Sequence, residues 1–390
     1  MRTLRALRTP VAATAAVMSL ALAATTSGAQ ADTRTAAPSS HSTQQRGPDN
    51  ENYDPPVYSP TTQTTYVGTP GNPLVRGWGV YQGLAEMAWL PYVVASPDQQ
   101  NLLDKIVQRP KATWFGHWQS DNDITDRVRK YIELTTGGDP DVLVQTSIFR
   151  MDPWEGEACT RLPSAAEQAS YKKWIDGFVA GVGDAHMAVI MQPDGPFALC
   201  APGGSNLPAH MIRYAVRMLS ALPNTSVYID AGAADWNRDD PQKAVRMLFP
   251  MGIRWARGFA LNSTHYDSTE RQVRYAAEVS QALAKRGIPD KYGVINTASN
   301  GKPFKGYKYN GPNFDNARAC TSTSDKHCVT LGIPPTVDVA DPKWGLNPHD
   351  RRLAARYVDA YMWFGRPWLY NQASPFDMNR ALTLARTTPY

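Results

Sequence analysis

From residue 72 to the C-terminus, short apolar segments alternate with longer amphipathic ones. Apolar runs bounded by polar or turn residues predict buried β-strands, here at 142–149, 188–191, 227–230, 258–261, 292–295 and 358–364. Helical spacing of apolar residues predicts helices between them, at 164–182, 207–222, 240–249 and 269–286. Because strands and helices alternate, we expect a parallel sheet with βαβ crossovers. This number of units fits an α/β fold in which the sheet closes, or nearly closes, into a barrel.

Polar side chains stand where four of these strands end. Asp194, Asp230, Asn262 and Asn296 each close or directly follow an apolar run. The carboxyl ends of parallel strands meet at one edge of a sheet, and active sites of α/β proteins lie there. The pattern therefore predicts a functional site at this edge.

The first 31 residues have the organisation of a secretory signal peptide. Arg2, Arg5 and Arg8 precede an apolar stretch at 11–24, and Ala-Gln-Ala at 29–31 is a typical cleavage site. The apolar stretch is too short for a membrane span, which needs about 20 residues. We expect cleavage before Asp32 and a secreted, extracellular protein without a membrane span; an uncleaved N-terminal anchor is the alternative.

Residues 32–71 contain much Thr, Ser, Pro, Gln and Asn and almost no aliphatic side chains. Such a composition does not bury enough apolar surface to offset the entropy lost on ordering. The sequence therefore predicts three parts: a signal peptide at 1–31, a disordered tail at 32–71, and a single barrel domain at 72–390.

Charge and aromatic content narrow the choice of partner. The chain has 40 Lys and Arg against 35 Asp and Glu, and it contains no long basic run. Nucleic acid is therefore not an expected partner. The 11 Trp and 18 Tyr are either core residues or flat surfaces on which a sugar ring packs.

Four cysteines, Cys159, Cys200, Cys320 and Cys328, remain in the expected mature chain. An even number in an exported protein indicates two disulfides, for which three connectivities exist. The local pairs, Cys159–Cys200 and Cys320–Cys328, are the simplest. No spacing of Cys and His suits a metal site, so we expect neither metal nor cofactor.

Five motifs resemble, in order and spacing, those of glycoside hydrolase family 6, the inverting cellulases. They lie at 112–116 (Ala-Thr-Trp-Phe-Gly), 189–194 (Val-Ile-Met-Gln-Pro-Asp), 228–232 (Tyr-Ile-Asp-Ala-Gly, followed by Trp236), 258–262 (Gly-Phe-Ala-Leu-Asn) and 358–363 (Val-Asp-Ala-Tyr-Met-Trp). The resemblance implies the distorted parallel (β/α) barrel of that family and makes Asp194 the general acid. It also implies that Trp114, Trp236, Asp230 and Asn262 bind substrate, and that Cys159 pairs with Cys200.

Several positions depart from the family pattern. The family's general-base Asp falls on Asn371, and its sugar-binding Lys and Glu fall on Gly365 and Leu369. The carboxylate that normally assists the acid falls on Ala158, where Glu155 or Glu157 offers a substitute. Trp154 and Trp368 are additional aromatic residues, which we expect to reshape the cleft.

Inverting hydrolysis needs a protonated acid and a second carboxylate that activates water, about 6.5–9.5 Å apart. An amide at 371 is not basic at neutral pH. A displaced base is one possibility, with Asp338, Asp341 and Asp377 as candidates, and a water chain to a distant carboxylate is another. The sequence thus supports a glucanase acting on β-1,4-glucosidic bonds of cellulose or a related β-glucan. The alternative is a catalytically impaired relative that only binds glycan.

Overall fold

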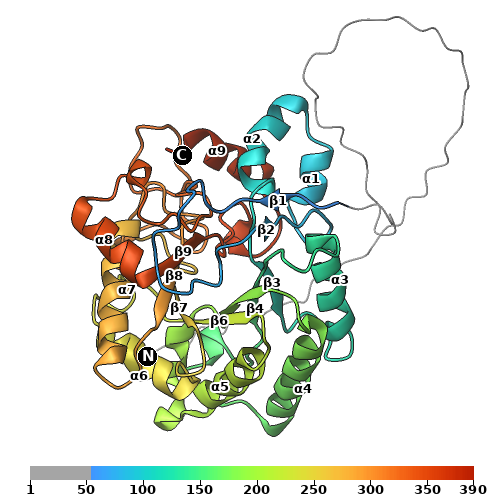
Figure 1. Ribbon diagram of the computed structural model, residues 1–390, viewed down its shortest axis with the longest axis vertical. Helices are drawn as coiled ribbons and strands as arrows, with labels where there is room; N and C mark the ends of the chain where they lie inside the picture. The colour runs from blue at the N-terminus through green and yellow to red at the C-terminus, as the bar shows by residue number, and fades with distance from the viewer. Residues whose placement is uncertain (1–53) are drawn as a thin grey trace, which may run out of the picture. The chain divides into compact units, whose positions relative to one another are not determined.

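A seven-stranded parallel sheet organises residues 54–390, the part of the chain that the computed structural model describes (Figure 1). The strands follow one another in chain order, so every crossover joins neighbours. The sheet curls into a half-barrel with helices around it, which confirms the predicted α/β, barrel-like fold class. Its strands are β3 (Thr113–Gly116), β4 (Val144–Phe149), β5 (Met187–Met191), β6 (Thr225–Asp230), β7 (Gly258–Leu261), β8 (Tyr292–Asn296) and β9 (Val358–Met362).

The two edges of the sheet approach each other where β9 ends. The backbone N–H of Ala112 donates to the carbonyl of Trp363 at 2.9 Å, and Nε1 of Trp114 donates to the carbonyl of Phe364 at 2.8 Å. These two bonds link the β3 edge to the β9 edge and bring the first and last predicted motifs together.

Several helices begin at residues that cap a helix N-terminus. Ser164 and Glu167 form a reciprocal capping box at the start of α4, and Ser268 accepts from the Arg271 N–H at the start of α7. The four predicted helices are thereby confirmed, with ends shifted by a few residues. The helices are α1 (Trp89–Val93), α2 (Pro97–Val107), α3 (Ile124–Thr136), α4 (Ala165–Val182), α5 (Leu207–Ser220), α6 (Pro241–Met251), α7 (Thr269–Ala284), α8 (Pro348–Tyr357) and α9 (Met378–Thr387).

Strand residues alternate between two buried layers, as the pleat of a strand requires. On β5, Met187, Val189 and Met191 pack in the layer under the helices, whereas Ala188 and Ile190 face the inside of the half-barrel. Both faces are buried, which explains why these strands read as continuous apolar runs.

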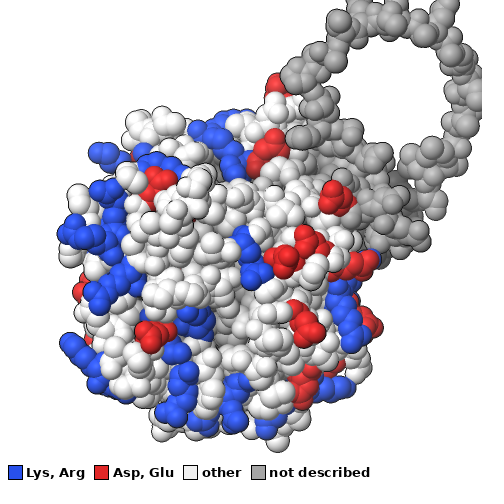
Figure 2. Space-filling view, in the orientation of Figure 1, with Lys and Arg blue, Asp and Glu red and all other residues white. Residues whose placement is uncertain are grey.

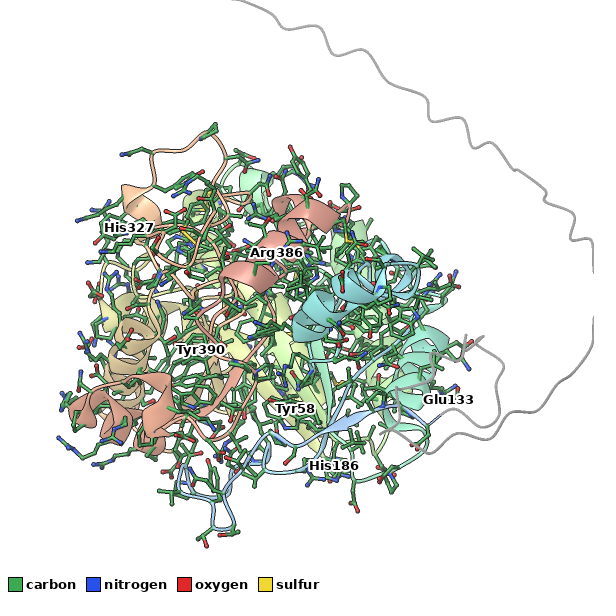
Figure 3. All side chains as sticks on the ribbon, turned by 90° about the horizontal axis from the view of Figure 1, so that it is seen from above. Tyr58, Glu133, His186, His327, Arg386 and Tyr390 are labelled. Carbon is green, nitrogen blue, oxygen red and sulfur yellow. A yellow bond between two sulfur atoms is a disulfide. The ribbon has the colours of Figure 1, made fainter. Side chains whose placement is uncertain are left out.

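Residues 54–71 differ from the expected disordered tail, because they pack on the barrel domain. The strand β1 (Val57–Tyr58) pairs antiparallel with β2 (Trp78–Gly79), and Tyr58 marks it in Figure 3. The carbonyl of Pro60 accepts from the Val337 N–H at 2.9 Å, and the Thr69 hydroxyl donates to the buried Asp359. Hydroxyl and carbonyl groups of this polar segment thus form hydrogen bonds with the barrel domain. The composition of the segment does not predict these bonds. The rest of the predicted tail and the predicted signal peptide lie outside the described residues.

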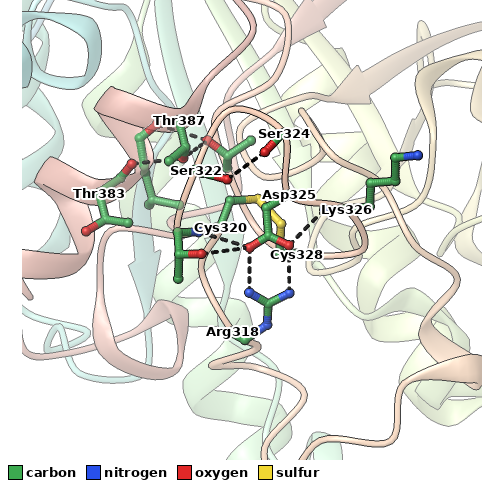
Figure 4. Close-up of a disulfide and its surroundings, with 12 residues drawn as sticks. Arg318, Cys320, Ser322, Ser324, Asp325, Lys326, Cys328, Thr383 and Thr387 are labelled. Carbon is green, nitrogen blue, oxygen red and sulfur yellow. Dashed lines mark hydrogen bonds and ion pairs between the residues drawn. A yellow bond between two sulfur atoms is a disulfide. The ribbon is translucent and has the colours of Figure 1, made fainter.

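Both local disulfides are present, as the simplest of the three connectivities predicts. Cys159 pairs with Cys200, and Cys320 pairs with Cys328. Figure 4 shows the second of these beside the ion pair in which Arg318 donates to Asp325 at 2.7 Å. The Thr321 N–H also donates to Asp325 at 3.1 Å, so the short loop between the cysteines is held by charge as well as by the disulfide.

Charge is distributed over the surface in small groups. Figure 2 shows Lys and Arg in separate clusters on this face, with Asp and Glu among them and uncharged surface between. The net charge of +5 is therefore not gathered into one basic area on this face. No helix within residues 54–390 combines the length and apolarity needed to cross a membrane.

Candidate active site

Asp194 lies just beyond the carboxyl end of β5, where the chain turns sharply. Its φ of 64° lies in the left-handed region, which Asp tolerates better than most residues. The side chain is 7% exposed, and its Oδ1 accepts a hydrogen bond from Oγ1 of Thr264 at 2.7 Å. The carboxyl is therefore held in a single place at the sheet edge where the sequence predicts a site.

The surroundings of Asp194 keep it protonated near neutral pH. Burial raises its pKa to about 7, although the Thr264 hydrogen bond opposes the rise. The negative charges of Asp230 and Glu155 add to the rise. A carboxyl that keeps its proton at pH 5–6 is able to donate it to a leaving oxygen, as a general acid must.

Removal of the Thr264 hydroxyl should shift the pH dependence of any reaction that uses Asp194 as an acid. The hydroxyl stabilises the ionised carboxylate, so Thr264→Val should raise the pKa of Asp194 further. We expect the alkaline limb of kcat/KM to move up by about 1 pH unit, since a hydrogen bond to a charged group contributes about 1.5 kcal/mol. Thr264→Ser keeps the hydroxyl and should leave the profile in place. A downward shift in Thr264→Val would contradict this assignment.

Asp230, at the end of β6, orders the loop that carries Asp194. Its Oδ1 accepts from the N–H groups of Gly195 at 2.9 Å and Gly232 at 2.8 Å, and the Ser263 hydroxyl donates to Oδ2. The backbones come so close that a Cβ at Gly195 would lie 2.3 Å from the Asp230 carbonyl oxygen. Burial raises the pKa of Asp230 to about 6. The Asp230 side chain is fully buried, and its hydrogen bonds go to groups of the protein itself.

Asn262 and Asn296 tie neighbouring strand ends together. Nδ2 of Asn262 donates to the carbonyls of Asp267 and Asn296 at 3.2 Å, and Nδ2 of Asn296 donates to the Asn262 carbonyl at 3.0 Å. Oδ1 of Asn296 accepts from the Gly365 N–H at 3.0 Å. Both side chains are fully buried. Of the four predicted strand-end residues, Asp230, Asn262 and Asn296 therefore bond the backbone around Asp194.

Trp236 is half-buried and stacks on a histidine that the sequence analysis did not single out. The rings of Trp236 and His265 lie 4.9 Å apart at 18°, with Phe197 edge-on to the indole at 5.5 Å. Nδ1 of His265 lies 3.0 Å from Oδ1 of Asp235. Burial alone would lower the pKa of His265, but the Asp235 hydrogen bond and charge raise it above its usual value. One face of Trp236 is therefore covered by the imidazole ring of His265. The place of His265 in the sequence, three residues after Asn262, is a signal that would have pointed to it.

Trp114 is half-buried on β3, an edge strand of the sheet. The guanidinium carbon of Arg366 lies 4.0 Å from the centre of its ring, and Phe149 contacts it at 5.3 Å. Of the two additional tryptophans, Trp154 is buried and donates to the carbonyl of Pro193 at 3.1 Å, and Trp368 is 1% exposed. Trp154 thus braces the residue before Asp194.

Asn371, which the resemblance places at the base position, is exposed in a short turn, with φ of 50°. Its Oδ1 accepts from Nδ2 of Asn313 at 2.8 Å. Ala158 is buried in the core, where it brings no carboxylate. Of the two glutamates near it, Glu157 pairs with Arg161 at 3.0 Å, whereas the charge of Glu155 acts on Asp194.

The three C-terminal aspartates considered as displaced bases make structural bonds. Asp377 accepts from the Arg380 N–H at 2.9 Å at the start of α9, and Asp341 pairs with Lys343 at 2.8 Å. Asp338 accepts from the Thr62 N–H at 2.7 Å and so holds the N-terminal segment.

Comparison with known proteins agrees with this architecture. Residues 85–345 match the sequence profile of the family Glycosyl hydrolases family 6. Endoglucanase A of Cellulomonas fimi is 28% identical over 230 residues, which are 58% of this chain and 48% of that protein. Endoglucanase 1 of Streptomyces halstedii is 31% identical over 205 residues, which are 52% of this chain and 62% of that protein. The chain thus matches less than two thirds of the length of either relative.

Two solved structures share the fold. The endoglucanase Cel6 of Mycobacterium tuberculosis, in complex with a thio-linked cello-oligosaccharide, has 23% sequence identity and a TM-score of 0.64 over 81% of this chain and 99% of that chain. Cellobiohydrolase II of Humicola insolens, in complex with glucose and cellotetraose, has 18% identity and a TM-score of 0.55 over 76% and 87%. With the profile match across most of the barrel, these findings show that the chain belongs to glycoside hydrolase family 6.

Proposed function

We propose that this protein is a secreted glucanase that hydrolyses β-1,4-glucosidic bonds of cellulose or a related β-glucan by inversion, with Asp194 as the general acid. The observation that carries the proposal is the buried carboxyl at the end of β5, whose pKa is raised to about 7. Family membership and the endoglucanase names of its relatives support the substrate class. Two disulfides and the predicted signal peptide support secretion.

In this mechanism Asp194 gives its proton to the glycosidic oxygen while water attacks the anomeric carbon from the opposite face. Asn371 does not take the proton from that water. We therefore assign this task, directly or through a water chain, to Glu155, whose charge acts on Asp194, and to Asp315, whose charge acts on Glu155. Burial raises the pKa of both Glu155 and Asp315.

Glycan binding without turnover is the second candidate, and one observation favours it. The residue at the base position, Asn371, uses its side-chain oxygen to accept from Asn313. An asparagine held in this way activates no water. A protein with this loop and no working replacement base would bind glycan through its aromatic residues and release nothing.

The deciding experiment follows reducing-end release from soluble β-1,4-glucans and the anomeric form of the first product by NMR. A glucanase of the proposed kind releases reducing ends in the α configuration. Glu155→Gln should lower kcat about 10²-fold or more, because general-base assistance is removed. Glu157→Gln, in the same short turn but paired with Arg161, is the matched control and should keep full activity. Polymer binding without any release would support the second candidate instead, and β products would exclude inversion.

A further inference from the structure

A cavity of about 270 Å³ lies between β3, the segment before α1 and the loop that follows β9. Charged and aromatic side chains share its wall, among them Glu86, Lys111, Trp114, Trp118, Arg366 and Trp368. Trp118 is 52% exposed, so one aromatic ring at this place is available to a ligand. The cavity is therefore a pocket with both an aromatic surface and a cationic one.

Within residues 54–390, the guanidinium of Arg366 forms neither a hydrogen bond nor an ion pair, and Glu86 acts on it through its charge alone. Its Nε is buried without a hydrogen bond, and its guanidinium forms no ion pair with a described side chain. Burial lowers its pKa to about 10, although the negative charge of Glu86 opposes this fall, and Arg366 stays charged at neutral pH. The neighbouring Nε1 of Trp368 is likewise buried without an acceptor among the described residues. This wall therefore holds two buried N–H donors, on Arg366 and Trp368, that have no acceptor within residues 54–390.

The other cations near the cavity are already satisfied. Nζ of Lys111 donates to the carbonyls of Ile106 and Arg109 and lies 3.6 Å from Oε2 of Glu86. Arg127 lies 3.8 Å from Asp123. The single carboxylate of Glu86 pairs with Lys111 and also acts on Arg366 through its charge, so the pocket keeps an excess of positive charge. Since a buried guanidinium costs free energy unless it is paired, the pocket favours an anionic ligand.

We propose that this pocket binds the carboxylate of an acidic sugar, a uronic acid residue within a β-linked glycan, through Arg366. A guanidinium bonds a carboxylate through two parallel hydrogen bonds, and this match is stronger than that with a neutral hydroxyl. Trp118 supplies a surface for the sugar ring. A neutral sugar gains less here, because the Arg366 guanidinium already covers one face of Trp114. This inference rests on the proposed function for its substrate class, and it defines which glycan the site prefers.

The test is calorimetric binding to the full chain carrying Asp194→Asn, so that no result depends on turnover. The two probes are a β-1,4-linked tetrasaccharide in which glucose alternates with glucuronic acid, and cellotetraose, its neutral counterpart. We expect the acidic probe to bind at least about 10-fold more tightly at low salt. The preference should shrink as salt is added, because the contact is between charges. Equal or tighter binding of cellotetraose overturns the proposal, whatever its rate of hydrolysis.

Arg366→Met should reduce the preference to less than about 2-fold while it leaves cellotetraose binding within about 3-fold. Arg129→Met, which removes an exposed arginine of α3, is the matched control and should keep the preference. Retention of the acidic preference in Arg366→Met would overturn the role of Arg366. If Arg366→Met does not fold, the comparison of the two probes on the protein with Arg366 intact still decides the proposal. If the protein hydrolyses no glucan but still binds the acidic probe more tightly, the proposed glucanase activity is rejected and the proposed uronic acid site stands.

Discussion

The Asp194→Asn variant should hydrolyse soluble β-1,4-glucan about 10²–10⁴-fold more slowly than the parent protein. The amide has nearly the same shape as the carboxyl and still accepts the Thr264 hydroxyl at Oδ1, but it has no proton to give to the leaving oxygen. Because the acid acts only in the transition state, kcat should fall while KM changes little. Initial rates of reducing-end release from both proteins measure the effect. Asp126→Asn, an exposed aspartate on α3, is the control and should be fully active.

The stability of the same variant shows whether its loss of activity comes from misfolding. Burial raises the folded pKa of Asp194 to about 7, whereas an unfolded Asp titrates near 4. The folded state therefore binds this proton more tightly, so its contribution to stability is complete below about pH 4 and is lost as pH rises through 7. Asn does not ionise, and Asp194→Asn should be more stable than the parent at pH 8, by up to about 4 kcal/mol, but not at pH 4. Lower stability at pH 8 would contradict the raised pKa.

Asp359→Ala should be among the most destabilising single changes in the domain, at about 3–5 kcal/mol. Asp359 is fully buried on β9, and its carboxylate accepts from Nε of Arg257 at 2.9 Å and the Tyr228 hydroxyl at 2.7 Å. The Thr69 hydroxyl also donates to it. Alanine would leave a guanidinium and a buried phenol without their acceptor, and it would loosen residues 54–71. Urea unfolding of both proteins measures the difference in free energy.

An exposed ion pair gives the matched comparison for Asp359. Asp126 lies 3.6 Å from Arg129, with both side chains more than half exposed. Solvent screens such a pair, so Asp126→Ala should change the free energy of unfolding by less than about 1 kcal/mol. If Asp359→Ala were equally mild, the buried network would not anchor the N-terminal segment as described.

The strands could be predicted from the sequence because both faces of the sheet are buried, which makes each strand a continuous apolar run. Asp194 lies three residues after the apolar run of β5, Asp230 ends that of β6, and the structure brings these two carboxyls to one edge. The two disulfides are the local pairs, the simplest of the three connectivities that the sequence leaves open. Local sequence carried enough information for these features because each depends on one strand end or one short loop.

Contacts between segments that are far apart along the chain could not be predicted from the sequence. The tail boundary at residue 71 was wrong because Thr61, Thr62 and Thr69 find their acceptors more than 270 residues away, on Asp338 and Asp359. Likewise, Arg366 meets Trp114 only because the two edges of the sheet come together. Composition describes how polar a segment is, but it does not say which partner will satisfy those polar groups.

Leaving-group dependence tests the central claim, that Asp194 is the general acid, most directly. The measurement compares the parent protein and Asp194→Asn on two cello-oligosaccharides, one with a dinitrophenolate leaving group that needs no proton and one with a sugar leaving group that needs one. If Asp194 is the acid, the variant should cleave the dinitrophenyl substrate at close to the parental rate and lose about 10²–10⁴-fold on the sugar substrate. An equal loss on both substrates, or no loss on either, would contradict this role for Asp194.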